Sequence, residues 1–440
     1  MRGFFSSLLV LLLVQGLRAD DWPQWLGPQR DGIWREKNLL KKFPEGGPAV
    51  RWRTPIGSGY AGPAVAGGRV FVLDRQVASG ASNPKDPFDR GIIHGQERIL
   101  CLDEKTGKIL WQHAYECPYS ISYASGPRTT PLIEGGRVYT LGAEGNLFCL
   151  QASDGKVVWS KDFKTEFNIP TPMWGFAAHP LLDGNKLICL AGGSNSVAVA
   201  FDKNTGKELW RALGAKEPGY APPTLVEAGG RRQLILWHAE GINSLDPETG
   251  KLFWSEPWAM RSGMSIATPR LSGDRLFLTA FYNGSTMLKL DHDKPAATVL
   301  WQSKKVSEKD TTELHSTMST PFFDGDYIYG VCSYGQLRCL KASTGERVWE
   351  TMAATTEKET RWGNAFLIRN EDRYFLFNER GDLIIAKLSP AGYEEISRAH
   401  LLEPTNNDPG RPVVWSHPAF ANRSVYARNE REIVCVSLAP

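Results

Sequence analysis

The sequence predicts an all-β protein, an eight-bladed β-propeller built from four-stranded antiparallel blades. The first observation is a repeat of the form "DEKTGKILW", whose last residue recurs as Trp111, Trp159, Trp210, Trp254, Trp301 and Trp349, at intervals of 44 to 51 residues. The second is that each interval holds several short apolar runs separated by turn residues. A period in the forties with short β runs is typical of a propeller blade.

The unit from Met318 to Trp349 shows the expected order of elements. Its runs "TPFF", "YIYGVC", "LRCLKA" and "RVW" predict four short strands, A to D, and "DGD", "SYGQ" and "STGE" form the turns between them. Gly345, in the last turn, is expected to take the left-handed conformation that closes the hairpin between strands C and D. The tryptophan on the outermost strand is expected to pack between neighbouring blades, where its large area is buried.

Eight strand-A starts set the number of blades. Seven contain a proline, namely Pro63, Pro131, Pro180, Pro223, Pro269, Pro321 and Pro418, and one, "GNAFLI", does not. The last unit ends at "EIVCVSL" without a fourth strand, whereas "AVRWRTP", with Trp52, precedes the first unit. We therefore expect the N-terminal strand to complete the last blade and close the ring, which removes the open sheet edges. Sevenfold closure is the alternative, because the repeat that ends at Ser397 has lost its tryptophan.

The N-terminus predicts export. Residues 1–19 combine one basic residue, Arg2, with an apolar run from Phe4 to Val14 and a small residue, Ala19, as in a secretory signal peptide. An uncleaved anchor is the alternative. The predicted organisation is a signal peptide at 1–19, an N-terminal extension at 20–49 and the propeller at 50–440. No second long apolar segment follows, so we expect no membrane span after cleavage and a periplasmic or secreted protein.

Charge and cysteine content argue against a nucleic-acid-binding protein and against a disulfide-stabilised one. The 51 basic and 48 acidic side chains nearly cancel, and no long run of one sign occurs, so no nucleic-acid partner is expected. Cys101, Cys149, Cys339 and Cys435 occupy the same place in different repeats. Equivalent positions in separate sheets are too far apart for a disulfide, so we expect buried free thiols.

The chemically varied residues lie in the loops between strand D of one blade and strand A of the next. In an up-and-down blade, these D–A loops emerge on the face opposite the C–D turns that carry the repeat. The insertion Asp74–Gln96, between strands B and C of the first blade, lies on the same face. Long insertions in otherwise economical repeats are often functional, so this one is expected to shape a site unless it is a solvated loop.

Candidate ligand-binding residues stand at the channel end of strand A. They carry aromatic, cationic or titratable side chains: Arg128, Trp174, His179, His315, Trp362, Asn364, Trp415 and His417, with Tyr60 and Tyr220 beside them. Together they predict a funnel with aromatic walls, suited to a planar or anionic ligand. The alternative is that the aromatic rings wedge between blades and the histidines hydrogen-bond neighbouring loops.

The repeat resembles the pyrroloquinoline-quinone (PQQ) repeat, and the resemblance covers about residues 50–438. The segment "DWPQWLGPQRDGIW", Asp21 to Trp34, also looks like the opening of exported PQQ-like propellers from planctomycete-type bacteria. That family includes quinone-dependent alcohol and sugar dehydrogenases, and also the propeller lipoprotein of the outer-membrane β-barrel assembly machinery, which binds no quinone. The resemblance therefore implies the fold and leaves the function open.

Features that the resemblance implies for a quinone dehydrogenase are mostly missing. Such enzymes use a vicinal Cys-Cys pair, a stacking tryptophan, a calcium site of carboxylate and Asn ligands, and a catalytic Asp. This sequence has no adjacent cysteines, and it offers matches by type only in Asn364 and the loop tryptophans Trp174, Trp362 and Trp415. No G-x-S-x-G, H-E-x-x-H or phosphate-binding glycine loop occurs. We assign no catalytic and no metal-ligating residue, since His179 and His417 would have to meet across the channel to share a metal.

The sequence thus favours a non-enzymatic, monomeric binding or protein-interaction scaffold of the cell envelope. Its expected partner is an envelope protein or a small polar or planar ligand in the central channel, and no cofactor is expected. Two alternatives stay open. One is a PQQ-dependent dehydrogenase with PQQ in the channel, and the other is a carbohydrate-binding or carbohydrate-processing propeller, with which the tryptophan-rich loops are compatible.

Overall fold

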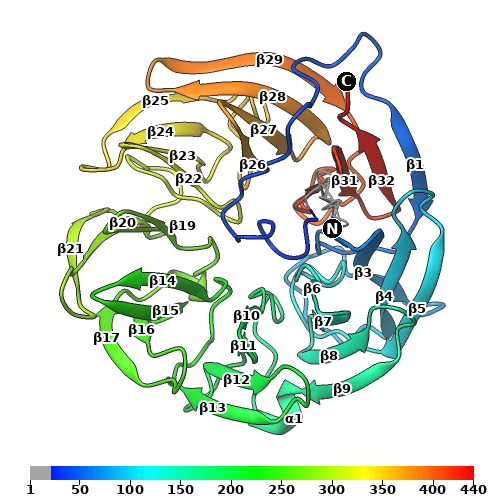
Figure 1. Ribbon diagram of the computed structural model, residues 1–440, viewed down its shortest axis with the longest axis horizontal. Coiled ribbons are helices and arrows are strands. Elements are labelled where there is room, and N and C mark those ends of the chain that lie inside the picture. Colours follow the sequence, from blue (N-terminus) through cyan, green and yellow to red (C-terminus); the bar gives the residue numbers. More distant parts are fainter. Residues whose placement is uncertain (1–20) are drawn as a thin grey trace, which may run out of the picture.

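A ring of eight blades makes up the protein. The computed structural model describes residues 21–440, and the predicted signal peptide at 1–19 lies outside the described residues. Within that range the strands form eight four-stranded antiparallel sheets around a central axis (Figure 1). The prediction of an all-β, eight-bladed propeller is confirmed, and the sevenfold alternative is wrong.

The blades are numbered 1 to 8 along the chain, each with strands A to D from the channel outward. Blade 1 contains β2 (Ala64–Ala66), β3 (Arg69–Val77), β4 (Gly95–Asp103) and β5 (Ile109–Glu116); blade 2, β6 (Leu132–Glu134), β7 (Arg137–Leu141), β8 (Asn146–Gln151) and β9 (Val157–Asp162); blade 3, β10 (Leu181–Asp183), β11 (Lys186–Leu190), β12 (Ala198–Asp202) and β13 (Glu208–Ala212); blade 4, β14 (Thr224–Ala228), β15 (Arg231–His238), β16 (Gly241–Leu245) and β17 (Leu252–Pro257).

The second half of the ring follows the same plan. Blade 5 contains β18 (Arg270–Ser272), β19 (Arg275–Ala280), β20 (Gly284–Leu290) and β21 (Ala297–Gln302); blade 6, β22 (Phe322–Asp324), β23 (Tyr327–Val331), β24 (Leu337–Lys341) and β25 (Arg347–Thr351); blade 7, β26 (Ala365–Asn370), β27 (Arg373–Asn378), β28 (Asp382–Ser389) and β29 (Gly392–His400); blade 8, β30 (Ala419–Ala421), β31 (Ser424–Arg428) and β32 (Glu432–Ser437).

The N-terminal strand closes the ring, as predicted. Strand β1 (Val50–Pro55) pairs antiparallel with β32 and supplies the outer strand of blade 8, with Trp52 opposite Cys435. The first and last parts of the propeller are thereby joined by backbone hydrogen bonds. No blade within residues 21–440 lacks its fourth strand.

The repeated tryptophan and glycine form a contact between adjacent blades. Trp111 of blade 1 lies over Gly155 of blade 2, where a Cβ atom would stand only 2.5 Å from the indole Cε3. Its indole N–H also donates to the carbonyl of Ala152 at 3.0 Å. Gly155 has a φ of +73°, so the position needs glycine both for its backbone conformation and for the missing side chain. The same contact recurs in the pairs Trp52–Gly107, Trp159–Gly206, Trp210–Gly250 and Trp301–Gly345.

Three positions in the ring depart from this contact. The indole N–H of Trp349 donates to the carbonyl of Ser389 in blade 7 at 2.8 Å, but a Cβ atom at Gly392 of that blade would have nothing within 4 Å. The indole N–H of Trp254 donates within its own blade, to Gln233 Oε1 at 2.9 Å. At Ser397, which replaces the tryptophan in blade 7, the hydroxyl oxygen accepts from the backbone N–H of Phe43 at 3.1 Å. The N-terminal extension therefore reaches the position where the repeat sequence has diverged.

That extension runs across the centre of the ring at one of its ends (Figure 1). Trp22 pairs with Val65 of blade 1 through backbone hydrogen bonds of 2.8 and 2.9 Å. Further along, Arg270 of blade 5 donates to the carbonyl of Asp31 at 2.6 Å, and the carbonyl of Arg369 in blade 7 accepts from the N–H of Trp34 at 2.8 Å. Both Trp22 and Trp34 are 1% exposed, so the extension is part of the core.

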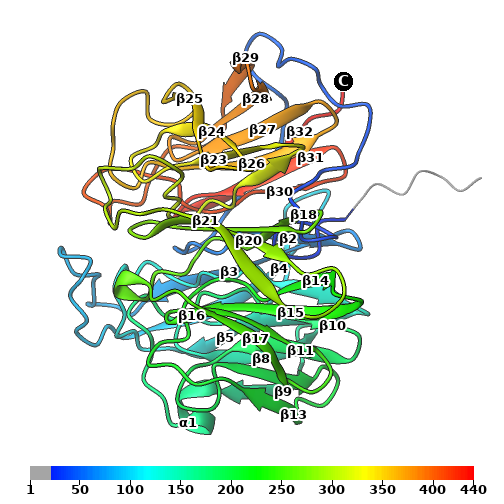
Figure 2. The same cartoon turned by 90° about the vertical axis from the view of Figure 1, so that its left-hand side faces the viewer.

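The opposite end of the channel carries the non-repeating loops. Figure 2 shows the insertion in light blue on one side of the ring and the beginning of the described chain on the other. The helical segments α1 (Phe163–Phe167) and η1 (Arg261–Gly263) both lie in D–A loops. Among residues 21–440, no helix is long and apolar enough to cross a membrane.

The cysteines are buried and unpaired. All seven lie within the described part of the chain, and none forms a disulfide. Cys101, Cys149, Cys339 and Cys435 occupy the C strands of four blades, as the repeat predicts. The expectation of buried thiols is confirmed, and burial raises the pKa of the Cys101 thiol to about 11.

Candidate functional site

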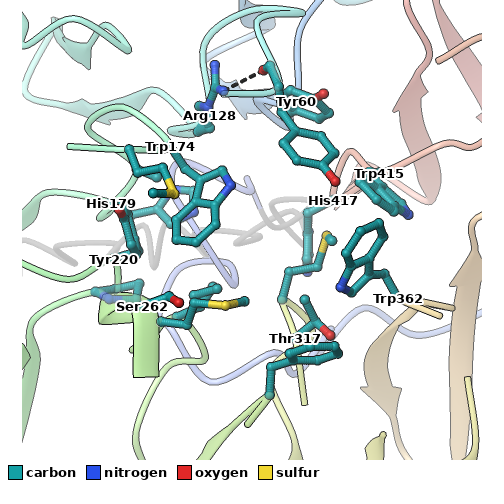
Figure 3. A pocket seen from close by; sticks show the side chains of 18 of the residues that line it. Tyr60, Arg128, Trp174, His179, Tyr220, Ser262, Thr317, Trp362, Trp415 and His417 are labelled. Carbon is teal, nitrogen blue, oxygen red and sulfur yellow. Dashed lines mark hydrogen bonds between the residues drawn. The ribbon is translucent and has the colours of Figure 1, made fainter. Parts of the chain in front are cut away.

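A cavity of about 430 Å³ lies where the D–A loops surround the channel. Six of the eight candidate residues line it: Arg128, Trp174, His179, Trp362, Trp415 and His417. Tyr60 and Tyr220 also lie in its wall. Figure 3 shows Trp174 on one side of this space and Trp362 and Trp415 on the other. We call this space the D–A cavity.

Residues that the sequence did not single out complete the wall. Met173, Met264 and Met318 lie in three different D–A loops and line the cavity with thioether side chains. Phe88, from the insertion between β3 and β4, also lines it and meets Tyr123 edge-on at 5.3 Å between ring centroids. The insertion therefore contributes to the wall, as its position on this face suggested.

The floor of the cavity comes from the N-terminal extension. The indole of Trp25 stacks on the His179 ring at 4.0 Å between centroids and 10° between planes, and the His417 ring lies 4.7 Å away. The Trp25 indole N–H donates to Thr268 Oγ1 at 2.9 Å. His179 and His417 thus approach each other across the channel with an aromatic ring between them. No part of the repeat points to Trp25, since it precedes the first blade.

Both cavity histidines are neutral at pH 7. Burial lowers the pKa of His417 to about 4, and burial, together with the charge of Arg30 and the neighbouring His417, holds the pKa of His179 well below its usual value. His179 Nδ1 accepts from the backbone N–H of Thr130 at 3.0 Å. His417 Nδ1 lies 2.6 Å from the Pro418 carbonyl. The contact of His179 matches the alternative in which the histidines hydrogen-bond neighbouring loops, whereas His417 contacts the next residue of its own segment.

The two arginines of the wall already have partners. The Arg128 guanidinium donates to the carbonyls of Ser122 (3.0 Å), Tyr123 (2.6 Å) and Gly126. Its plane also lies over the Tyr60 ring at 5.1 Å. Arg361 forms an ion pair with Glu308 at 2.6 Å. The charge of Arg361 is therefore paired, whereas Arg128 has its N–H donors used by neutral carbonyls.

A buried ion pair holds Trp415 in place. Its indole N–H donates to Glu379 Oε2 at 3.2 Å, and Arg411 donates to both oxygens of the same carboxylate at 2.9 and 3.1 Å. A carboxylate that receives two guanidinium hydrogen bonds has a fixed orientation. The indole ring consequently has a defined position in the wall.

Three residues of the D–A cavity or its rim adopt a left-handed backbone. Tyr123, Ser262 and Trp362 have φ values of +57°, +56° and +62°. Such values are uncommon outside glycine, and residues held in sparsely populated regions cluster at ligand-binding sites. Here they turn the chain so that two aromatic side chains face the cavity.

His315 and Asn364 lie outside the cavity, unlike the other six candidates. His315 is fully buried, and its Nδ1 lies 3.2 Å from the carbonyl of Phe281, a lining residue. Asn364 is 2% exposed, and its backbone carbonyl accepts from the N–H of Glu379 at 3.1 Å. Both stand behind the wall and contact residues that form or orient it. Their position in the repeat, at the channel end of strand A, is the same for residues that line the cavity and for residues that lie behind its wall, so the sequence could not distinguish the two.

The donor groups do not fit a metal–quinone centre. Over residues 21–440, no group of three or more His, Cys, Asp or Glu side chains is arranged to hold a metal ion. No carboxylate side chain lines the D–A cavity, although calcium requires six to eight oxygen ligands. A quinone with several carboxylates would meet only Arg128 and Arg361, each already bound as described. The residues present therefore do not fit PQQ with calcium.

Comparisons with known proteins place the chain among PQQ-like propellers. A family model described as "Outer membrane protein assembly factor BamB" matches residues 95–351 and, overlapping, residues 196–400. Outer membrane protein assembly factor BamB from Shewanella oneidensis is 22% identical over 268 residues, which make up 58% of this chain and 65% of that protein. Quinoprotein ethanol dehydrogenase from Pseudomonas putida is 25% identical over 146 residues, 30% of this chain and 23% of the enzyme. The chain thus spans less than two thirds of the length of each of these relatives.

A solved structure supports the same fold. The crystal structure of BamB from Moraxella catarrhalis matches with a TM-score of 0.53 and 17% sequence identity, and the match covers 88% of this chain and 98% of that one. At this identity the likeness shows a shared fold. Because the family model matches more than half of the sequence, the chain belongs to the PQQ-like propeller family described as outer membrane protein assembly factor BamB.

Proposed function

We propose that this protein is an exported, non-enzymatic scaffold of the cell envelope that binds a partner protein through the face carrying the D–A loops. The observation that carries the proposal is the aromatic and methionine-rich D–A cavity, framed by loops with exposed apolar side chains. Ile92, in the insertion, is 72% exposed, and Val306, in the loop between blades 5 and 6, is 59% exposed. Both loops also supply cavity-lining residues, Phe88 and Thr317.

The combination of a deep apolar pocket and an apolar surround is typical of a protein interface. Binding energy at such interfaces is concentrated in a few aromatic residues in desolvated pockets, and surrounding contacts exclude water. Exposed aliphatic side chains beside a pocket extend the contact beyond the size of a small ligand. The family description, which names an assembly factor, agrees with a role in binding other proteins.

The proposal includes the place where the protein works. The predicted signal peptide at 1–19 and the name of the family both support a periplasmic or secreted protein. The resemblance of Asp21–Trp34 to exported propellers of planctomycete-type bacteria supports the same location. We expect a monomer that presents the D–A face to its partner.

The D–A cavity gives less support to the two alternatives. A PQQ-dependent dehydrogenase requires the metal and quinone ligands that the cavity does not supply. A carbohydrate site places hydrogen-bonding groups beside an aromatic face, whereas Arg128, His179 and Trp415 direct their polar atoms to the protein itself. Titration with PQQ and calcium, followed by tryptophan fluorescence, and a glycan-array screen are expected to show no saturable binding.

Affinity capture from envelope extract tests the proposal. The mature chain is compared with the double variant Ile92→Asp/Val306→Asp and with a matched control, Leu110→Asp, on the outer strand of blade 1, where Leu110 is 49% exposed. The same partner should be captured by the wild type and by the control and lost by the double variant, because a carboxylate in the contact is costly to desolvate. Equal capture by all three proteins, or no reproducible partner, would reject the proposal.

A further inference from the structure

We propose that the D–A cavity is a socket for an uncharged aromatic side chain of the bound polypeptide. This inference rests on the proposed function and names the chemical group that the site takes. It follows from the size of the cavity, the charge state of its wall and the kind of surface that the wall presents.

The cavity has the size of a single anchor. Its volume of about 430 Å³ is near the lower end of the roughly 300–1,000 Å³ that small-ligand pockets occupy. Trp25 closes its inner end, so an occupant must enter from the D–A face and cannot thread through the ring. A side chain projecting from a docked segment meets both conditions, and an extended polypeptide inside the channel does not.

The wall excludes charged occupants. His179 and His417 are neutral, Arg128 donates to three backbone carbonyls, and Arg361 is paired with Glu308. An ammonium group would lose its water on entry and find no carboxylate in this wall. A carboxylate would meet only the guanidinium groups of Arg128, which donates to three carbonyls, and of Arg361, which is paired with Glu308. Buried charges without partners are strongly disfavoured, so the occupant is neutral.

The wall also favours an aromatic occupant over an aliphatic one. Trp174, Trp362 and Trp415 present ring surfaces, and Met173 and Met318 present polarizable sulfur atoms. Aromatic pairs and sulfur–aromatic contacts gain affinity beyond the area buried, whereas an aliphatic side chain gains from area alone. The expected advantage of an aromatic group is roughly two- to tenfold in affinity.

Two lining residues have a buried polar atom that is free to hydrogen-bond the occupant, the Nε of Arg361 and the uncharged hydroxyl of Thr317. Thr317 Oγ1 is buried and has no hydrogen-bond partner among the atoms of residues 21–440. A hydroxyl group can donate or accept, so it can meet the phenol of tyrosine or the indole N–H of tryptophan. The wall is thus better matched to tyrosine and tryptophan than to phenylalanine.

Binding of capped amino acids tests the inference. The aromatic probes are N-acetyl-tryptophanamide and N-acetyl-tyrosinamide. N-acetyl-leucinamide serves as the aliphatic comparison and the amide of N-acetyl-glutamate as the charged one. Binding of each probe is measured by ligand-observed NMR. We expect saturable binding of the aromatic probes with dissociation constants on the order of 0.1 to 1 mM. The leucine probe should bind about two- to tenfold more weakly, and the glutamate probe should show no saturable binding.

A cavity-filling variant locates the binding. Ala177 lines the cavity, so Ala177→Trp should weaken aromatic binding at least tenfold. Ala391→Trp adds the same side chain at an exposed turn between β28 and β29 and should leave binding unchanged. Near-UV circular dichroism of both variants establishes that the fold is retained. Binding of the charged probe as tight as that of the aromatic probes, or unchanged aromatic binding in Ala177→Trp, overturns the inference.

The two proposals can fail separately. If the partner is captured but the aromatic probes do not bind, the scaffold function stands and the aromatic socket is rejected. If the probes bind in the cavity but the partner is captured equally by the Ile92→Asp/Val306→Asp variant, the socket stands and the proposed partner-binding surface is rejected.

Discussion

Replacement of Gly155 by alanine should destabilise the propeller through the contact between blades 1 and 2. The substitution has two costs. The φ of +73° is unfavourable for alanine by about 1–2 kcal/mol. In addition, the new Cβ would stand 2.5 Å from Cε3 of Trp111, and overpacking of this kind costs typically about 1–3 kcal/mol. We therefore expect a loss of about 2–5 kcal/mol in the free energy of unfolding.

A second glycine provides a matched control. Gly136, in the turn between β6 and β7, has a φ of +75°, and a Cβ there would have nothing within 4 Å. Gly136→Ala therefore carries the backbone cost of about 1–2 kcal/mol and no contact cost. For a chain of this length, each kcal/mol lowers the Tm by about 1 °C. Calorimetry should show a drop of about 2–5 °C for Gly155→Ala and about 1–2 °C for Gly136→Ala.

A double variant isolates the contact itself. Trp111→Ala removes the ring that the new Cβ would meet. In a protein that carries Trp111→Ala, Gly155→Ala should therefore lower the free energy of unfolding by about 1–3 kcal/mol less than in the wild type, because the overpacking cost is absent. Equal losses for Gly155→Ala and Gly136→Ala would show that the tryptophan does not constrain the turn. The same conclusion would follow if the two effects at 111 and 155 were simply additive.

Three further predictions concern the buried groups. Because His417 is neutral in the folded protein with a pKa of about 4 and titrates near 6.5 when unfolded, the unfolded state binds more protons between these values, and stability falls as the pH is lowered from about 6.5 to 4. The wild-type Tm should therefore fall more steeply over this range than that of His417→Gln. Trp25→Ala should admit water to the histidines and raise the pKa of His179 and His417 toward their usual value, measured by NMR titration; unchanged values would mean that the ring does not shield them. All seven cysteines should resist a thiol reagent in the native protein and react after unfolding, and rapid native reaction would contradict their burial.

The order of blades could be predicted because the repeat is local. Each strand, each turn glycine and each outer tryptophan is specified within a unit of about 50 residues by alternation and turn chemistry. The missing last strand and the extra first strand also predicted how the ring closes. Even the cysteines followed, since equivalent positions in separate sheets cannot meet.

The candidate site was predictable only in outline. The rule that D–A loops share one face identified the end of the channel where the D–A cavity lies, and six of the eight candidates line that cavity. It could not show that His315 and Asn364 turn behind the wall, because two residues at equivalent repeat positions differ only in how their loops fold. The contributions of Phe88 and the methionines carry no repeat signal at all.

By itself, the sequence determined the all-β class, eightfold closure by the N-terminal strand, the glycine in the C–D turns that keep the repeat motif, and the free cysteines. Only the tertiary structure decided that Trp25 lies between His179 and His417 at the inner end of the cavity, that Arg128 donates to backbone carbonyls, and that Arg361 is paired with Glu308. The physical reason is the range of the interactions. Periodicity and turn preference act within one blade, whereas the polarity and depth of the D–A cavity depend on side chains that are brought together from distant blades and from the extension.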